Sequence, residues 1–215
     1  SERSNMAGLE NVFFEGRELK NERLELTDKN SLYFLGPDLH LQGCEVILKI
    51  PARNLIFRGA RFTDCTFDVK QELKNFQEWI TVPIKGCRFK GRFNGCDFGH
   101  WPTYANYPEY QHGSIADCDF TEARLDNCRF IDCDPTTLRL PRWPCFTLFD
   151  PVRRSAELAR MPWPGDISPV TMASHDKDPK ATVAVTYHAP SLAKDSGTTA
   201  EAVRAVLETC EGVFY

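Results

Sequence analysis

The sequence predicts a mainly β fold, a four-sided β-coil with inserted loops, followed by a small α+β unit. Three observations predict it. A large apolar residue recurs every five positions over much of residues 6–140, a small residue stands two positions before many of them, and the repeat stops after Leu140. A period of five fits neither the 3.6 residues of a helical turn nor the two-residue alternation of a flat strand. It fits a chain that turns a corner every five residues, so that four sides close a coil of about twenty residues.

The repeat is clearest between Ile115 and Leu140, recurs at 55–67 and 84–98, and becomes looser toward the N-terminus. We expect the small and the large residue of each five to point inward and the other three to face solvent. Seven of the nine cysteines then occupy the small inward position: Cys44, Cys65, Cys87, Cys96, Cys118, Cys128 and Cys133. These cysteines, and many of the fifteen phenylalanines, are therefore predicted to be packing residues.

The segments that show the five-residue pattern best are Ala60 to Asp64, Cys65 to Phe67, Cys118 to Glu122, Ala123 to Asn127 and Cys128 to Asp132. They resemble the pentapeptide-repeat family, whose pattern is Ala or Cys, then Asp, Asn or Arg, then Leu or Phe, then two polar residues. The resemblance implies a right-handed quadrilateral β-helix, the pentapeptide-repeat solenoid, over residues 6–140 with insertions at 68–83 and 99–113. The repeat itself is structural, so the resemblance implies no functional residue.

Composition excludes several classes of function. Lys and Arg total 26 against 30 Asp and Glu, a net charge of −4, so no overall positive charge favours nucleic acid or an anionic membrane. No apolar run reaches the roughly 18 residues of a membrane span, and a secretory signal is absent from the first residues. No Cys-x-x-Cys knuckle occurs, so we expect no metal and no cofactor. We expect a cytoplasmic protein, and we interpret residues 1–5, before Met6, as a remnant of an expression vector.

The first insertion, 68–83, has apolar residues at helical spacing: Val69, Leu73, Phe76 and Ile80. The spacing predicts a short amphipathic helix packed on the coil. Trp79 stands beside this stripe, and we consider two roles for it, a packed core residue or part of a partner-binding surface.

The second insertion, 99–113, is rich in aromatic residues. Trp101, Tyr104, Tyr107 and Tyr110 recur every third residue, with Pro102 and Pro108 between them. Proline discourages both a helix interior and a strand ladder, so we expect a loop. The loop either folds back onto the coil or forms an interaction surface, since Trp and Tyr dominate the energetic centres of protein interfaces.

Acidic residues follow this loop along the chain. We single out Asp117, Asp119, Glu122 and Asp126. Two interpretations are open: these residues are the solvated exterior of the repeat, or they form an acidic face that steers a basic partner toward the aromatic loop.

Residues 141–215 are predicted to be an α+β appendage that caps the open end of the coil. Asp150 and Pro151 favour a helix start, and that helix is expected to end at Met161, before Pro162. We expect a loop over 162–179, a strand over 182–188 from its alternating pattern, and a second helix over 199–211.

No catalytic motif stands above background, and His175 and His188 are isolated in the sequence. We therefore expect a non-enzymatic binding protein, most specifically an immunity protein that neutralises a bacterial toxin. The alternative is a DNA mimic that binds a type II topoisomerase, as some pentapeptide-repeat proteins do, and the third is an enzyme of unrecognised type in the C-terminal region. The expected partner is a protein such as a toxin domain, not nucleic acid or a membrane, and homodimerisation is left open.

Overall fold

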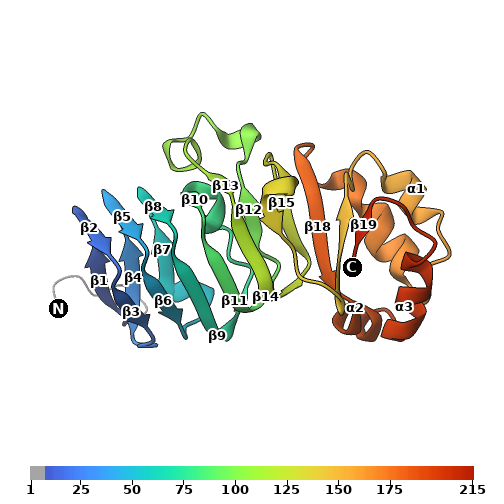
Figure 1. Ribbon diagram of the computed structural model, residues 1–215, viewed down its shortest axis with the longest axis horizontal. Helices are drawn as coiled ribbons and strands as arrows, with labels where there is room; N and C mark the ends of the chain where they lie inside the picture. Colours follow the sequence, from blue (N-terminus) through green and yellow to red (C-terminus); the bar gives the residue numbers. More distant parts are fainter. Residues whose placement is uncertain (1–7) are drawn as a thin grey trace.

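The computed structural model describes residues 8–215, and Figure 1 shows strands stacked along the N-terminal part and helices gathered at the C-terminal end. The residues that we interpret as a vector remnant, 1–5, lie outside the described residues. The described part is mainly sheet, with 19 strands and three α-helices. Each of these helices has at most eight residues, so no helix in residues 8–215 is long and apolar enough to cross a bilayer.

Three of the four sheets are parallel ladders. The three-stranded sheet contains β1 (Glu10–Phe14), β4 (Ser31–Leu35) and β7 (Leu55–Phe57). The five-stranded parallel sheet runs, from one edge to the other, β13 (Ser114–Ala116), β10 (Pro83–Lys85), β8 (Ala60–Thr63), β5 (Leu39–Gln42) and β2 (Arg17–Lys20). The six-stranded sheet runs β16 (Leu138–Arg139), β14 (Cys118–Asp126), β11 (Arg88–Asn94), β9 (Thr66–Lys74), β6 (Glu45–Leu48) and β3 (Arg23–Leu26).

The fourth sheet is mixed and joins the two parts of the molecule. Its order is β12 (Asp97–Gly99), β15 (Cys128–Ile131), β18 (Thr182–His188), β17 (Cys145–Phe149) and β19 (Val213–Phe214). β12 and β15 are parallel, whereas β18 pairs antiparallel with both β15 and β17.

The prediction of a single right-handed quadrilateral β-helix is wrong, because the strands belong to several separate parallel and mixed sheets. Two features explain the difference. β9 and β14 each run for nine residues, so each continues past the point where a five-residue side would turn its corner. The three-stranded sheet ends at β7, and the sheet that begins with β12 and β15 is completed by strands from the C-terminal part.

The predicted amphipathic helix in the first insertion is also wrong. β9 continues to Lys74, and only Glu78–Thr81 forms a 3-10 turn, η2. Val69 and Leu73 are four positions apart and therefore lie on the same, buried face of β9, and the pairing with β11 shifts between them, Val69 facing Gly91 and Leu73 facing Phe93. Extra residues in one strand therefore produced the four-residue spacing that favoured a helix.

Trp79 is a core residue with 0% exposure, which excludes it from the predicted partner-binding surface. Its ring centroid lies 5.1–6.4 Å from those of six phenylalanines. They are Phe57, Phe67, Phe76, Phe89, Phe93 and Phe98. The indole fills the centre of an aromatic core, and its Nε1 has no hydrogen-bond acceptor. The first insertion thus supplies the core rather than the surface.

The inward position of the cysteines is confirmed for six of the seven that the repeat places there, which are at most 2% exposed. Cys133 is half-buried, and burial raises the pKa of its thiol to about 12. The buried thiols donate weak hydrogen bonds to backbone carbonyls; Cys65 Sγ, for example, lies 3.3 Å from the oxygens of Leu41 and Thr63. All nine cysteines are free thiols.

The C-terminal part follows the predicted elements only partly. The strand over 182–188 is confirmed as β18, and α3 (Ala200–Leu207) lies within the predicted 199–211. The helix predicted to end at Met161 is reduced to α1 (Ser155–Ala159). The predicted loop over 162–179 contains a π-helix, η6 (Ile167–Met172), and a 3-10 helix, η7 (Ala173–Lys177). α2 (Ala189–Asp195) was not predicted, although Pro190 at its first turn is a typical helix start.

Candidate functional site

The aromatic loop, defined here as residues 99–113, leaves and rejoins the sheets at two glycines. A Cβ atom on Gly99 would collide with the carbonyl oxygen of Ile131, and one on Gly113 with the carbonyl oxygen of Ile80. Gly99 also has a φ of +109°, a backbone conformation that L side chains rarely adopt. Both stems of the loop are therefore held against neighbouring backbone, and the loop rises from β12 above the stacked strands (Figure 1).

The three-residue spacing of the aromatic residues corresponds to consecutive 3-10-type turns. The backbone N–H of Tyr104 donates to the carbonyl of Trp101 at 3.1 Å, that of Tyr107 to Tyr104 at 2.9 Å, and that of Tyr110 to Tyr107 at 3.0 Å. Side chains three residues apart eclipse each other in such turns, so the four rings emerge on the same side. The two prolines begin the turns η3 (Pro102–Tyr104) and η4 (Pro108–Tyr110).

The four rings pack on one another around Tyr104. Its centroid lies 5.5 Å from that of Trp101, 6.1 Å from that of Tyr107 and 5.6 Å from that of Tyr110. Tyr104 and Tyr107 nevertheless remain 41% and 51% exposed, and Val170 is the one other large hydrophobic residue exposed in the described part of the chain. The loop therefore does not fold back into the core. Its four rings form a small cluster of their own, in which Tyr104 and Tyr107 are exposed to solvent.

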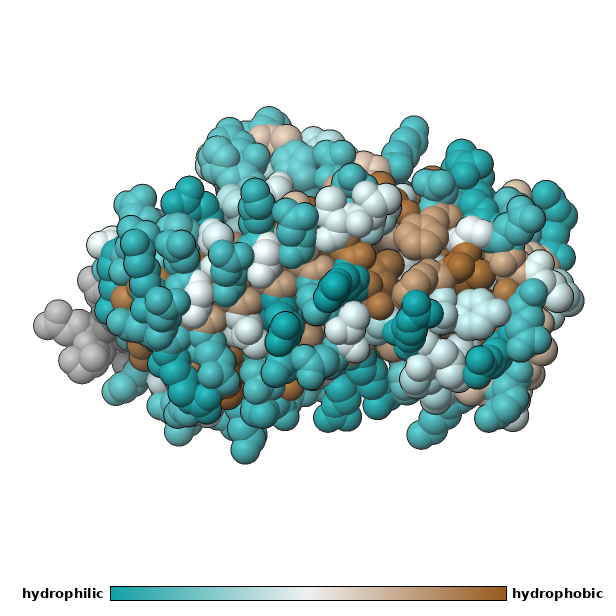
Figure 2. Space-filling model, in the orientation of Figure 1, coloured by the Kyte–Doolittle hydropathy of each residue, from teal (hydrophilic) through white to brown (hydrophobic). Residues whose placement is uncertain are grey.

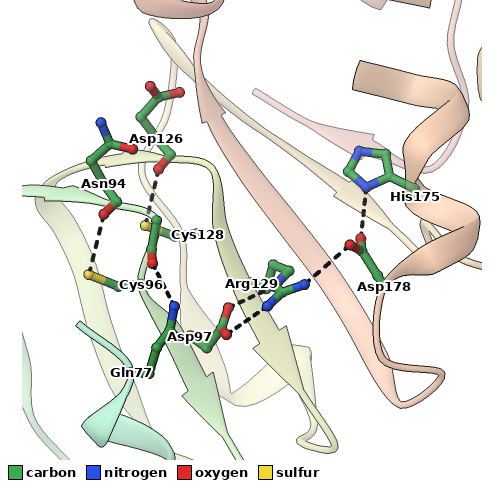
Figure 3. Close-up of polar contacts among 10 residues, drawn as sticks. Gln77, Asn94, Cys96, Asp97, Asp126, Cys128, Arg129, His175 and Asp178 are labelled. Atoms are coloured by element: carbon green, nitrogen blue, oxygen red, sulfur yellow. Dashed lines mark hydrogen bonds and ion pairs between the residues drawn. The ribbon is translucent and has the colours of Figure 1, made fainter. Parts of the chain in front are cut away.

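A buried polar network supports the base of the loop (Figure 3). Arg129, in β15, donates from Nε and Nη2 to the two carboxylate oxygens of Asp97 at 2.7 and 2.8 Å, and from Nη1 to Asp178 at 3.2 Å. Asp97 is only 1% exposed. His175 Nδ1 lies 2.8 Å from the other oxygen of Asp178, and its Nε2 lies 3.0 Å from the hydroxyl of Tyr187. The network links β12, β15 and β18.

The network also reaches the loop. The guanidinium of Arg129 lies 5.7 Å from the centroid of the Trp101 ring, within cation–π range. Hydrogen bonding to Asp97 raises the pKa of Arg129, so the cation that faces the indole is permanent. Trp101 is half-buried in this position, which fixes the first ring of the loop.

A groove of about 600 Å³ lies between the loop and the outer face of the five-stranded parallel sheet. Pro108, Glu109 and His112 line it from the loop. A row of residues in register across β2, β5 and β8 lines it from the sheet: Glu18, His40 and Arg61. His40 Nδ1 lies 3.2 Å from Arg61 Nη2 and 3.4 Å from Glu18 Oε1, so the row is internally paired. The groove carries charges of both signs.

Glu78 lies under the other side of the loop. It lines a second hollow with Phe57, Pro108 and Tyr110, and its Oε1 accepts a hydrogen bond from the backbone N–H of Phe57 at 3.2 Å. Burial raises the pKa of Glu78 to about 7, against the smaller effects of that hydrogen bond and of Arg58. A carboxyl group that titrates near neutrality therefore lies beneath the aromatic cluster.

The four acidic residues singled out in the sequence do not form a free acidic face. Asp117 occupies a corner with a φ of +54°, a conformation that Asp tolerates well. Glu122 Oε2 lies 3.9 Å from Lys90 Nζ. Asp119 Oδ2 lies between two arginines, 3.9 Å from Arg88 and 3.8 Å from Arg139. Burial acts to raise the pKa of Asp119, but hydrogen bonds from Thr121 and these arginines outweigh it, and the pKa is lowered.

Asp126 has a structural role instead. Its Oδ1 accepts a hydrogen bond at 3.1 Å from the backbone N–H of His188, at the end of β18, and burial raises its pKa. Asp119 and Glu122 are thus paired across strands and Asp126 is used in the junction, and the groove under the loop is lined by none of the four acidic residues. The predicted steering of a basic partner by an acidic face beside the loop has no support in this arrangement.

A polar hollow of about 550 Å³ between the six-stranded sheet and α2 is the candidate catalytic site in the C-terminal region, because Asp195 and Ser191 line it. Ser191 Oγ lies 2.7 Å from His188 Nδ1 and 2.9 Å from Arg124 Nη2. His188 Nδ1, however, caps α2 by accepting from the backbone N–H of Ser191. Burial and the charge of Arg124 lower the pKa of His188 to about 4, so it is a poor general base at neutral pH.

No protein-family model matches this chain, and neither a curated protein nor a solved structure resembles it closely enough to count as a match. The resemblance to the pentapeptide-repeat family therefore stays a prediction. Within residues 8–215, no group of three or more His, Cys, Asp or Glu side chains is arranged to hold a metal ion.

Proposed function

We propose that this chain is a binding protein that recognises a protein partner through the aromatic loop. The observation that carries the proposal is the exposure of Tyr104 and Tyr107 on a loop already ordered by its own backbone turns and ring contacts. Tyrosine offers a large amphipathic contact area with few rotatable bonds, and an ordered loop loses little conformational entropy on binding. Aromatic residues of this kind are enriched among the energetic centres of protein interfaces.

The mixed charges of the adjoining groove favour a protein partner over nucleic acid. Glu18 and Arg61 carry opposite charges on either side of His40 across the sheet, and Glu109 lines the groove from the loop. Nucleic acid binding draws most of its affinity from unpaired basic residues on phosphates. A DNA mimic has the opposite requirement, a surface of unpaired acidic groups, whereas Asp119 is paired here.

The specific form of the proposal is a blocker of one partner, such as an immunity protein that neutralises a bacterial toxin domain. A short ordered loop on a rigid set of sheets suits a single tight contact, because the contact surface changes little on binding. This form predicts that the partner, expressed alone in a bacterium, arrests growth and that co-expression of this chain restores it.

The experiment that tests the proposal places a photo-crosslinking amino acid, benzoylphenylalanine, at position 107 in the full chain. The control carries the same amino acid at position 170, since Val170 is 67% exposed in a different part of the molecule. Both proteins are irradiated in a lysate of the organism that encodes the chain. The captured protein is then purified and its dissociation constant measured with the wild type and with the Tyr104→Ala/Tyr107→Ala variant.

We expect a protein crosslinked at position 107 and not at 170, with at least tenfold weaker binding to the double variant. Identical crosslinks at both positions, or equal affinity for the wild type and the double variant, would refute the loop as the contact surface. Growth arrest that this chain relieves, and that the double variant does not relieve, would support the toxin-blocking form.

A further inference from the structure

A second candidate surface lies where the six-stranded sheet meets the C-terminal strands. A groove of about 640 Å³ has an apolar floor made of Leu138, Leu140, Phe149 and Phe214, and Arg139 and Arg142 line it as well. Figure 2 shows hydrophobic surface gathered in this junction, with strongly hydrophilic residues at its margins. The aromatic loop contributes no residue to this groove.

Two sheet edges border the groove. Within residues 8–215, β16 is the last strand of the six-stranded sheet and pairs only with β14, and β19 is the last strand of the mixed sheet and pairs only with β17. Both edges contribute lining residues, Leu138 and Arg139 from β16 and Phe214 from β19. An open edge presents backbone N–H and C=O groups that can pair with an added strand. The groove therefore combines an apolar floor with unpaired edges, the arrangement used to capture extended peptides.

The charge of the groove selects the kind of peptide. Its lining contains two arginines and no acidic residue. The Arg139 side chain is 78% exposed, and it shares Asp119, 3.8 Å away, with Arg88. The Arg142 guanidinium lies 5.0 Å from the centroid of the Phe214 ring, and its Nη1 donates to the Tyr215 carbonyl oxygen at 3.4 Å. Both guanidiniums keep donors available for carboxylates.

We propose that this groove binds an extended acidic segment of a partner protein by strand addition. The alternating side chains of the segment divide between two environments: apolar ones face Leu138, Leu140 and Phe149, and carboxylates reach Arg139 and Arg142. Arginine suits this role because its planar fork matches a carboxylate in a bidentate geometry. This surface is separate from the aromatic loop, so the chain has two contact sites, and the test below does not depend on the proposed function of the loop.

The test uses a displayed library of random 12-residue peptides and the full-length protein. The library is selected on the wild type alone, and the best peptide is labelled for fluorescence polarisation. We expect the enriched peptides to alternate apolar and acidic residues, and binding to fall at least tenfold for the Arg139→Glu/Arg142→Glu variant. Arg160→Glu, the same change at an exposed position outside the groove, is expected to bind like the wild type.

Three further measurements separate the alternatives. Replacing backbone N–H groups of the peptide by N-methyl groups one at a time is expected to weaken binding at alternate positions, as strand addition requires. Tyr104→Ala/Tyr107→Ala is expected to leave peptide affinity unchanged. Thermal melts of each variant establish that it is folded, and Leu140→Ala offers a groove variant that keeps both arginines.

The proposal is overturned by any of four outcomes. The first two are that the enriched peptides lack acidic residues, or that they bind the arginine variant as well as the wild type. The third is that dodecanoate binds in the groove while no peptide is enriched. The fourth is a concentration-dependent dimer in sedimentation velocity that the arginine variant abolishes. The last two would assign the groove to a small amphiphile or to a second copy of this chain.

Discussion

The aromatic loop and the arginine-lined groove both expose apolar surface, but they are built in different ways. All four rings of the loop lie within ten consecutive residues and contact one another three or six positions apart. The groove is lined from β14, β16, β17 and β19, by residues separated by up to 93 positions, from Thr121 to Phe214. A surface made of local contacts is visible in the sequence, whereas one made by bringing distant edges together is not.

The largest effect on the free energy of unfolding is expected from Trp79→Ala, which tests the aromatic core beneath the loop. Removing an indole enclosed by six phenylalanines should lower the free energy of unfolding by about 4 kcal/mol, because the cavity cannot collapse among rigid rings. Urea denaturation followed by circular dichroism measures it. A loss of less than about 0.5 kcal/mol, typical of a surface position, would contradict the buried placement of Trp79.

A smaller but more selective effect is expected from Asp97→Asn. It removes the buried charge that pairs bidentately with the partly buried Arg129, which keeps only Asp178 as an ion-pair partner, and we expect a cost of about 3 kcal/mol, the low end for breaking a buried pair. Because Arg129 also contacts Trp101, the variant should loosen the loop and change the fluorescence of Trp101, while the affinity of the groove for its peptide stays constant. Equal loss at both surfaces would show that the network supports the whole molecule rather than the loop.

Glu78→Gln tests the residues beneath the loop through the pH dependence of the free energy of unfolding. The folded pKa of Glu78, about 7, lies above its ordinary value of 4.5, so its stabilising contribution is complete below pH 4.5 and is lost as pH rises through 7. The glutamine variant lacks this loss. We expect the unfolding free energy of the variant minus that of the wild type to increase by about 2–3 kcal/mol between pH 4.5 and 8. A constant difference over this range would show that Glu78 ionises normally.

The smallest effect on stability is expected from Tyr104→Ala/Tyr107→Ala. Both rings are about half exposed and pack on other rings of the loop, so the free energy of unfolding should change by less than about 1 kcal/mol. Chemical denaturation beside Trp79→Ala provides the comparison. A change as large as that of Trp79→Ala would mean that the loop is part of the core.

The sequence predicted the local features and missed those made by distant contacts. The small inward cysteines, the strand at 182–188 and the aromatic insertion are each visible within a few residues. Val69 and Leu73 appeared on a helical stripe because a register shift between β9 and β11 imitates helical spacing. His175 has a local partner three residues on, Asp178, that was not predicted, and its second partner, Tyr187, reaches it only when β18 folds beside it.

The prediction of the fold class was wrong for the same reason. The five-residue period places the inward residues of each short segment correctly. It does not tell where a strand continues past a corner, as β14 does. It also does not tell that β18 completes the sheet that β12 and β15 begin. The two interpretations of the acidic residues could not be separated from the sequence, because their partners Arg88, Arg139 and Lys90 lie on neighbouring strands. Only the register of the sheet brings those charges together.

The central claim, that the aromatic loop is the contact surface for a protein partner, is tested most directly by the affinity of the partner captured at position 107. Isothermal titration with wild type and with Tyr104→Ala/Tyr107→Ala, at matched stability, should show at least a tenfold larger dissociation constant for the variant. Val170→Ala serves as the control and should bind like the wild type. Equal dissociation constants for all three proteins would contradict the account.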